Sequence, residues 1–273
     1  MVALMSASRW IRRRRWDLAR FGVTPRGVLH RLRPPAGAPR VLAISIPKAG
    51  THALERLLCL HPLLHRRLTR KVFPAQLGRL DDLLGKQRPG EVLCAHLHYN
   101  RQSERVVSSH SPATLFIVRD PRDIVVSQAY YTYRWKGHQW HERVKDLPDP
   151  RDRMRLFIEG DPRAGIASIG EVLELYRGWL DRCAVVRYED LVDPTRRLEE
   201  IARIYTHLGV SLPDGAVRRV AGELVSDVSV TFRAGRTGDW RQEFDERLER
   251  LFIERVGPSL AEFGYASEPP AQP

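Results

Sequence analysis

The sequence contains little cysteine and no long apolar run, and both absences limit the classes of protein that it can encode. Its 273 residues include only three cysteines, Cys59, Cys94 and Cys183. Their odd number and wide spacing fit buried thiols better than a disulfide framework or a metal site. No apolar stretch approaches the roughly 18 to 20 residues that span a bilayer. Residues 12–15 are all arginine and interrupt the one candidate signal peptide, so we expect a cytoplasmic protein.

Acidic side chains are almost absent from the first 40 residues, which carry most of the positive charge. Ten arginines stand there against Asp17 alone, so this arm holds +9 of the net charge of +12 and the rest of the chain +3. If residues 8–21 form a helix, four apolar side chains share one arc: Trp10, Ile11, Leu18 and Phe21. We expect an amphipathic helix at an anionic membrane face or a solvated basic arm. No basic and aromatic RNA-binding motif follows, so we expect no nucleic-acid partner.

Short apolar runs alternate with longer amphipathic stretches, which is typical of β-α units in a parallel sheet. They predict strands at residues 41–46, 92–97, 115–118 and 184–187, and helices at residues 51–60, 121–133, 169–180 and 194–208. We expect a single α/β domain of three layers, a central parallel sheet flanked by helices. It occupies residues 41–266, between the basic arm with its Pro-rich linker (residues 1–40) and a flexible tail (residues 267–273).

Polar side chains with complementary chemistry follow each of the four predicted strands. Lys48 follows the first strand, His96 and His98 end the second, Arg119 closes the third, and Tyr188 follows the fourth. Ligands of open parallel sheets bind beyond the carboxyl ends of the strands. We therefore expect these five side chains to share one site.

The first strand end has the features of an anion-binding loop. Pro47, Lys48, Gly50 and Thr51 lie between an apolar strand and a helical pattern. Backbone N–H groups, an ammonium and a hydroxyl can meet one phosphate there. The loop is shorter than a Walker A loop, and its lysine precedes its glycine. The alternative is an ordinary helix start with a basic neighbour.

Two further segments carry groups that bind anions. Arg119 lies just before a predicted helix, and Ser127 lies about two turns into that helix. Their guanidinium and hydroxyl groups can therefore converge on one anion. Arg233, Ala234 and Gly235 belong to a loop rich in arginine and glycine. Each segment taken by itself has an alternative interpretation. Arg119 would pair with a nearby aspartate, and the loop that contains Arg233 would be an ordinary flexible, basic loop.

In this order, the segments resemble the sulfotransferase family that uses 3′-phosphoadenosine 5′-phosphosulfate (PAPS), over residues 41–265. The resemblance implies one domain similar to P-loop nucleotide kinases, no metal, and 3′,5′-adenosine bisphosphate as the product of the co-substrate. It implies Arg119 and Ser127 as ligands of the 3′-phosphate, completed by Arg233 and the backbone after it, with Tyr188 near the adenine. The loop for the 5′-phosphosulfate would comprise Lys48, Ala49, Gly50, Thr51 and His52.

Sulfuryl transfer to a hydroxyl needs a base for the hydroxyl proton and a cation near the leaving phosphate oxygen. Lys48 is the predicted cation. His96 is the predicted base, because it resembles the catalytic histidine of the family and an imidazole titrates near neutrality. His98 stands where the family often has proline, and it is the rival for this role or an auxiliary residue.

Three residues depart from the family pattern in the nucleotide site. His52 replaces a commonly hydroxylic residue, Ala53 replaces a tryptophan that stacks on the adenine in many eukaryotic cytosolic members, and Ala234 stands where a lysine is common. We expect these departures to change nucleotide affinity and adenine stacking rather than the reaction class.

Six side chains crowd the side where the resemblance places the acceptor: Tyr130, Tyr131, Tyr133, Trp135, Trp140 and His141. We expect a hydroxylated acceptor, first a carbohydrate or glycolipid, and alternatively a phenol, sterol or other small metabolite. The alternative is that half of these rings pack the predicted helix at residues 121–133 against the sheet. A nucleotide or small-molecule kinase is the less favoured reaction, because no acidic residue near the loop is a plausible magnesium ligand.

Overall fold

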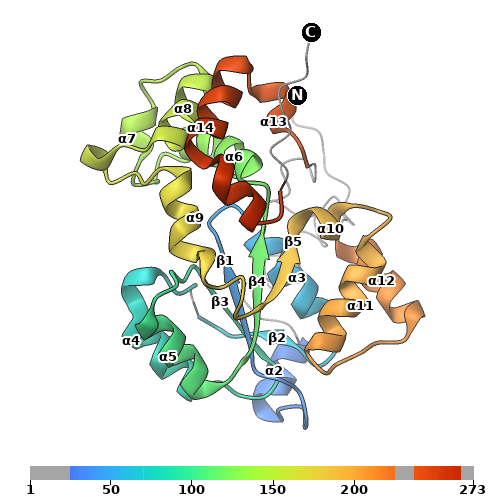
Figure 1. Cartoon of the computed structure of the whole chain (residues 1–273). Coiled ribbons are helices and arrows are strands. Elements are labelled where there is room, and N and C mark those ends of the chain that lie inside the picture. Colours follow the sequence, from blue (N-terminus) through green and yellow to red (C-terminus); the bar gives the residue numbers. More distant parts are fainter. Residues whose placement is uncertain (1–24, 70, 225–236, 266–273) are drawn as a thin grey trace, which may run out of the picture.

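The computed structural model describes residues 25–69, 71–224 and 237–265, and parallel strands lie at its centre (Figure 1). Their order across the sheet is β2-β3-β1-β4-β5, and every neighbouring pair is parallel. The strands are β1 (Val41–Ser45), β2 (His65–Arg66), β3 (Glu91–Ala95), β4 (Ala113–Val118) and β5 (Ala184–Arg187).

Helices connect the strands and continue after the last one. In the described ranges they are α2 (Pro25–Leu32), α3 (Thr51–Leu60), α4 (Leu77–Gly85), α5 (Arg101–His110), α6 (Pro121–Arg134), α7 (His141–Val144), α8 (Pro150–Glu159), α9 (Ile169–Arg177), α10 (Tyr188–Val192), α11 (Arg197–His207), α12 (Asp214–Leu224), α13 (Trp240–Glu243) and α14 (Glu246–Glu262). Two short 3₁₀ turns, η1 (Pro74–Gln76) and η2 (Pro162–Ala164), complete them.

Two hydrophobic cores lie on opposite faces of the sheet, because successive residues of a strand point to opposite sides. Val41 and Ala43 belong to a core with residues of α3, α11 and α12, whereas Leu42 and Ile44 belong to one with residues of α4, α5, α6, α8, α9 and α14. All residues of β1 are buried, as is typical of a central parallel strand. The predicted three-layer architecture is confirmed.

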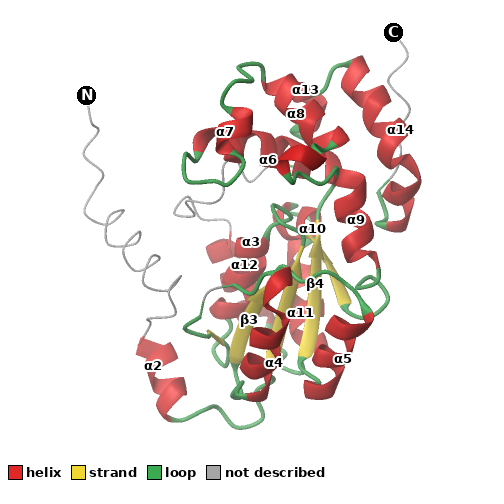
Figure 2. Ribbon diagram, turned by 90° about the vertical axis from the view of Figure 1, so that its left-hand side faces the viewer, coloured by secondary structure: helices red, strands yellow, loops and turns green. Residues whose placement is uncertain are grey.

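A group of helices lies beyond the carboxyl edge of the sheet, where α6, α7, α8 and α13 cover the strand ends (Figure 2). Two of them begin with the same four residues, Asp-Pro-Arg-Asp. Asp120 caps α6 by accepting the N–H of Arg122 at 2.9 Å, and Asp149 caps α8 by accepting the N–H of Arg151 at 2.8 Å. The two helices start alike, so only their surroundings distinguish them.

The four predicted strands and four predicted helices are confirmed, with ends that differ by at most three residues. The two-residue β2 was not predicted, because two residues carry no periodicity. Helix α5 was not predicted because only Ser103 and Val107 of its ten residues are buried, which leaves no clear apolar stripe. Helices α4, α8, α12 and α14 also lie outside the predictions.

The predicted basic arm is described only in part. Residues 1–24, including the amphipathic segment, lie outside the described residues, as do residues 267–273. Helix α2 follows the undescribed part and packs on β2, where the rings of His30 and His65 are 5.3 Å apart. Within the described ranges, no helix is long and apolar enough to cross a membrane. The domain boundaries at residues 41 and 266 stay predictions.

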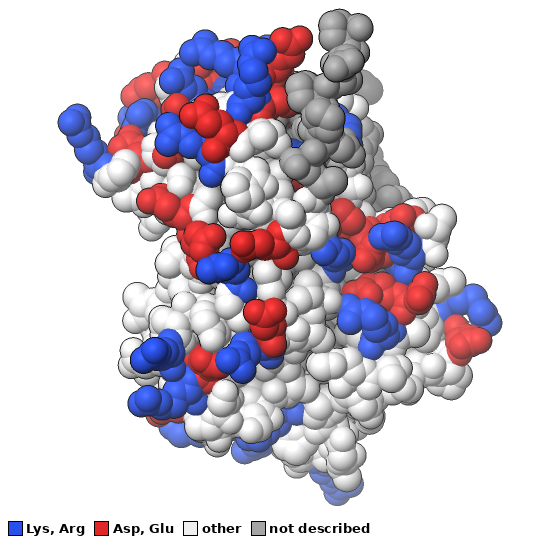
Figure 3. Space-filling view, in the orientation of Figure 1, with Lys and Arg blue, Asp and Glu red and all other residues white. Residues whose placement is uncertain are grey.

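Charges of both signs are interspersed over α8, α14 and the helices α10 to α12 (Figure 3). This view agrees with the sequence, in which residues 41–273 carry only +3. The high net charge of the chain is therefore a property of its first 40 residues.

Candidate active site

The loop from β1 to α3 turns sharply because two of its residues have left-handed backbone. The φ angles are 72° at Lys48 and 102° at Gly50, and the N–H of Ala49 closes the turn by donating to the carbonyl of Ile46 at 3.1 Å. Gly50 has no side chain that caps the first turn of α3. The first N–H groups of a helix have no partner within it and attract anions. The predicted phosphate loop therefore ends in a helix start whose N–H groups suit an anion.

Gly50 also allows the loop to approach Tyr188 closely. A Cβ atom at position 50 would lie 2.4 Å from Cδ2 of Tyr188 and 3.3 Å from Cδ1 of Ile117. Tyr188 begins α10, directly after β5, and is buried. The guanidinium carbon of Arg119 lies 4.6 Å from the centre of the same ring. Residues that follow β1, β4 and β5 thus meet around Tyr188.

Hydrogen bonds join the loop to His96, the predicted base. Ser45 ends β1 and is fully buried; its Oγ lies 2.8 Å from Oγ1 of Thr51 and 3.2 Å from Nδ1 of His96. The carbonyl oxygen of Ser45 lies 2.9 Å from the same Nδ1. Because a carbonyl only accepts, Nδ1 carries the proton and Nε2 keeps its lone pair. The imidazole therefore has the tautomer that a base requires at Nε2.

The surroundings of His96 keep its ring neutral. Burial lowers the pKa of His96 to about 4, and the hydrogen bond to Ser45 opposes this effect only in part. The ammonium groups of Lys71 and Lys48 act in the same direction as burial and contribute to this low value. At pH 7 the imidazole is thus uncharged and able to accept a proton.

His98 lies in different surroundings. Its ring contacts Tyr176 of α9 edge to face at 5.2 Å, and its carbonyl accepts the hydroxyl of Ser103 at 2.8 Å. Strand β3 already ends at Ala95, so the alternation of a strand does not place His98 on the same face as His96. Burial lowers the pKa of His98 as well. Of the two histidines, His96 is the one that contacts the phosphate loop.

His52 connects the loop to a lysine. Its Nε2 lies 3.3 Å from Nζ of Lys71, and its Nδ1 lies 3.6 Å from Oε2 of Glu55. An ammonium only donates, so Nε2 of His52 accepts and Nδ1 carries the proton that faces Glu55. Lys71 precedes Val72, whose carbonyl accepts the N–H of His96 at 2.8 Å. His52, which replaces a commonly hydroxylic residue of the family, thus contacts the ammonium of Lys71, one residue before the backbone partner of His96.

Arg119 and Ser127, the predicted ligands of one anion, lie beside the same face of α6. Nη2 of Arg119 reaches the first turn of the helix, 3.4 Å from Oδ2 of Asp123. Ser127 follows Asp123 by four residues, the spacing that places side chains one above the other on a helix, and it is half-buried.

The third predicted anion-binding segment lies outside the described residues: Arg233, Ala234 and Gly235. The described chain resumes at Thr237 and immediately contacts α6. The N–H groups of Gly238 and Trp240 donate to the carboxylate of Asp123 at 2.8 and 3.1 Å. The described end of this segment therefore lies beside Arg119.

Lys48 extends from the loop toward an open group of rings. Its Nζ lies 3.4 Å from the centre of the Tyr131 ring. The rings of Tyr131, Trp135 and His138 are 5.4 to 5.6 Å apart. Half of Trp135 and 39% of Tyr131 are exposed, so these rings form an accessible aromatic surface beside the predicted cation.

The other four predicted acceptor-side residues contact α6, α8 or α13, although Tyr133 is still 38% exposed. Their partners are Glu243 for the hydroxyl of Tyr130, Arg153 for the ring of Tyr133, Phe157 for Trp140, and the carbonyl of Thr132 for His141. The aromatic segment is therefore divided between packing and an exposed surface.

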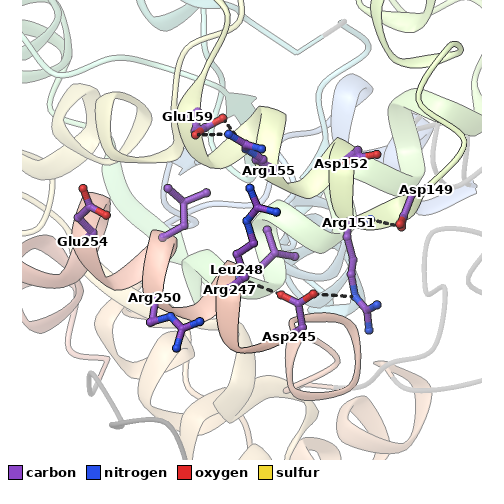
Figure 4. A pocket seen from close by; sticks show the side chains of 11 residues that line it. Asp149, Arg151, Asp152, Arg155, Glu159, Asp245, Arg247, Leu248, Arg250 and Glu254 are labelled. Carbon is purple, nitrogen blue, oxygen red and sulfur yellow. Dashed lines mark hydrogen bonds and ion pairs between the residues drawn. The ribbon is translucent and has the colours of Figure 1, made fainter.

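A pocket of about 560 Å³ between α8 and α14 lies apart from these residues (Figure 4). Its charged side chains pair with one another: Arg155 Nε lies 3.0 Å from Oε2 of Glu159, and Arg151 Nε lies 3.6 Å from Oδ2 of Asp245. Across the described ranges, no three or more His, Cys, Asp or Glu side chains are grouped to bind a metal ion. The loop, His96 and Arg119 therefore remain the candidate active site.

A parallel α/β sheet with an uncapped helix start, a neutral histidine and an arginine at its carboxyl edge is typical of one class: a nucleotide-dependent group-transfer enzyme. The sequence matches the family described as "Sulfotransferase domain" over residues 38–264. The chain therefore belongs to the sulfotransferase family, and the predicted family and enzyme class are confirmed.

Similar proteins agree with this assignment. A 3-beta-hydroxysteroid sulfotransferase of Cavia porcellus is 22% identical over 257 residues, which cover 79% of this chain and 83% of that protein. A mouse sulfotransferase complexed with PAP has a TM-score of 0.61 at 19% identity and covers 82% of this chain and 86% of its own. Retinol dehydratase in complex with androsterone and inactive cofactor PAP has a TM-score of 0.56 at 16% identity, covering 88% and 85%. These structures share the fold.

Three residues of the site were not predicted from the sequence. Ser45 is the last residue of an apolar strand, and its position gives a signal only when the partner strand is known. Lys71 lies in a segment without a motif. Asp123 was considered only as a possible partner of Arg119, although its carboxylate also binds a segment 115 residues away.

Proposed function

We propose that this sulfotransferase moves a sulfuryl group from PAPS to a hydroxyl of a hydrophobic small molecule. The hydrogen bonds from Thr51 through Ser45 to His96 carry the proposal. They hold a neutral base next to a loop that suits the sulfate-bearing phosphate of the donor.

In this mechanism His96 is the base and Lys48 the cation. Nε2 of His96 accepts the proton of the acceptor hydroxyl, whose oxygen forms a bond to sulfur while the bond from sulfur to the phosphate oxygen breaks. Lys48 and the start of α3 neutralise the negative charge that develops on that leaving oxygen. The product of the donor is 3′,5′-adenosine bisphosphate.

The nucleotide would lie along the carboxyl edge of the sheet. Arg119 and Ser127 bind the 3′-phosphate in this proposal, and Tyr188 lies near the adenine. The loop from Lys48 to His52 binds the other end of the nucleotide. The remaining ligands of the 3′-phosphate are Arg233 and the backbone of Ala234 and Gly235. The contacts of Tyr188 with Gly50 and Arg119 support one continuous nucleotide site.

The acceptor we propose is a sterol or phenol. The exposed rings of Tyr131 and Trp135 beside Lys48 suit a flat apolar ring system that carries a hydroxyl. The similarity to a 3-beta-hydroxysteroid sulfotransferase favours this class over the carbohydrate or glycolipid expected from the sequence. A glycolipid acceptor and a membrane contact of the basic arm stay predictions.

A transfer assay with PAPS labelled in its sulfate tests the proposal. The full chain is incubated in EDTA with a 3β-hydroxysteroid, a phenol, an oligosaccharide or a glycolipid in vesicles. We expect label on the steroid or the phenol without added metal. Label only on the oligosaccharide or glycolipid would contradict the proposed acceptor. Magnesium-dependent phosphate transfer from ATP, with none from PAPS, would instead indicate a kinase.

A further inference from the structure

Asp123 occupies a special position at the start of α6. Its side chain is fully buried, and its two oxygens meet three donors, one four residues away and two from a segment more than 100 residues away. Oδ2 lies 3.4 Å from Nη2 of Arg119 and accepts the N–H of Gly238 at 2.8 Å, while Oδ1 accepts the N–H of Trp240 at 3.1 Å. Burial raises the pKa of Asp123, and these three donors oppose the increase.

A second contact holds the segment after Thr237 against the first turn of α6. The guanidinium of Arg122 lies 3.9 Å above the ring of Trp240 and donates two hydrogen bonds to Asp120, from Nε at 2.9 Å and from Nη2 at 2.7 Å. Trp240 is itself buried. The segment that follows Thr237 is therefore docked on the first turn of α6 by a carboxylate and a stacked cation, and Asp123 bonds both this segment and Arg119.

We propose that Asp123 is a positioning residue for the 3′-phosphate of the donor. It acts through Arg119, whose guanidinium it orients, and through Gly238 and Trp240, whose N–H groups it holds at the first turn of α6 beside Arg119. This inference rests on the proposed function. A substitution of Asp123 is therefore predicted to lower the affinity for nucleotides with a 3′-phosphate and to change the affinity for nucleotides without one only a little.

The helix α8 offers a matched control. Asp152 occupies the same place in the second Asp-Pro-Arg-Asp start, three residues after the capping aspartate, and it is exposed. Asp123→Asn and Asp152→Asn therefore make the same chemical change at the same helix position. Only the first removes a carboxylate from Arg119 and the two N–H donors.

The experiment compares the affinities of the full chain for 3′,5′-adenosine bisphosphate and for AMP by calorimetry. For the wild type and for Asp152→Asn we expect the bisphosphate to bind more tightly than AMP. Asp123→Asn should lower the affinity for the bisphosphate by about tenfold or more, the value of one charge-assisted contact, and that for AMP by less than about threefold. If the Asn variant does not fold, Asp123→Ser, which is smaller and still accepts one hydrogen bond, is measured in the same way.

The nucleotide preference of the wild type tests the proposed function, and the preference of the Asp123 variant tests the role of Asp123. A wild-type chain that binds both nucleotides equally would contradict the 3′-phosphate site itself. A wild type that prefers the bisphosphate, with a variant that keeps the full preference or weakens both nucleotides equally, would overturn the role of Asp123 alone.

Discussion

His96 combines two properties that a general base needs, and each has its own physical cause. Burial lowers its pKa to about 4, so the ring is neutral at pH 7. The carbonyl of Ser45 accepts the proton on Nδ1 at 2.9 Å, so the lone pair is on Nε2. The same contacts connect the ring to Thr51 of the phosphate loop.

We predict that His96→Ala lowers the rate of sulfuryl transfer by about 10²- to 10⁴-fold, the usual contribution of a general base. The affinity for 3′,5′-adenosine bisphosphate should change little, because the hydrogen bonds of the His96 ring reach the loop through Ser45. Single-turnover assays and calorimetry measure the two effects. The matched control is His98→Ala, which should keep its activity; an active His96 variant and an inactive His98 variant would assign the base to His98.

The pH dependence follows from the direction of the pKa shift. The neutral ring is the active form, and its folded pKa lies below the ordinary value of 6.5. Activity that depends on His96 is therefore constant at neutral pH and is lost only as the pH falls toward about 4. A loss centred near 6.5 in the His98→Ala protein would contradict the assigned surroundings of His96.

At the scale of single residues, the sequence predicts the groups that follow strands and fails for those whose partner comes from elsewhere. Lys48, His96 and Arg119 were predicted because each stands at a strand end. Ser45 and Lys71 were not, since the contact of Ser45 with His96 and that of Lys71 with His52 depend on how distant segments pack.

At the scale of elements, the loop between β1 and α3 depends on Gly50 for two separate reasons. Its φ of 102° is unfavourable for residues with a side chain, and Tyr188 occupies the space that a Cβ atom would fill. Backbone conformation and the contact with Tyr188, the residue proposed to lie near the adenine, thus both depend on this one position.

We predict that Gly50→Ala lowers the affinity for 3′,5′-adenosine bisphosphate by at least about tenfold and the free energy of unfolding by about 1 to 3 kcal/mol. The cause is the displacement of Tyr188 together with the strained backbone. Gly209→Ala is the control, because Gly209 has a φ of 70° and nothing within 4 Å of an added Cβ. It should lower stability by about 1 kcal/mol without changing nucleotide affinity. Equal nucleotide affinity in both variants would contradict the role of the Tyr188 contact.

The repeated Asp-Pro-Arg-Asp start shows why motifs at this scale are ambiguous. Both copies cap a helix in the same way, but Asp123 is buried against Arg119 whereas Asp152 is exposed. The same local sequence therefore starts both helices, of which only α6 was predicted, and the long-range contacts decide which one belongs to the candidate site.

At the scale of the whole molecule, the strand order places the site residues in a row. Strands β3, β1, β4 and β5 are consecutive neighbours in the sheet. They carry, at their carboxyl ends, His96, Lys48, Arg119 and Tyr188. Strands β1 and β4, which precede Lys48 and Arg119, are direct neighbours about 4.8 Å apart, so the two residues proposed as phosphate ligands follow adjacent strands.

The sequence predicted the three-layer fold because buried parallel strands are short apolar runs separated by helical stretches. It did not predict the order of the strands, which is set by packing between residues far apart in the chain. The sites for the 5′- and 3′-phosphates could therefore be proposed from motifs, whereas their adjacency around Tyr188 required the structure.

The central claim is that this edge of the sheet binds a nucleotide with phosphates at both its 5′ and 3′ positions. Calorimetry of the full chain with 3′,5′-adenosine bisphosphate and with ATP, each with and without magnesium, tests it most directly. We predict that the bisphosphate binds at least about tenfold more tightly than ATP and that magnesium does not change its affinity. Failure to bind the bisphosphate, or tighter binding of ATP with magnesium, would contradict the account.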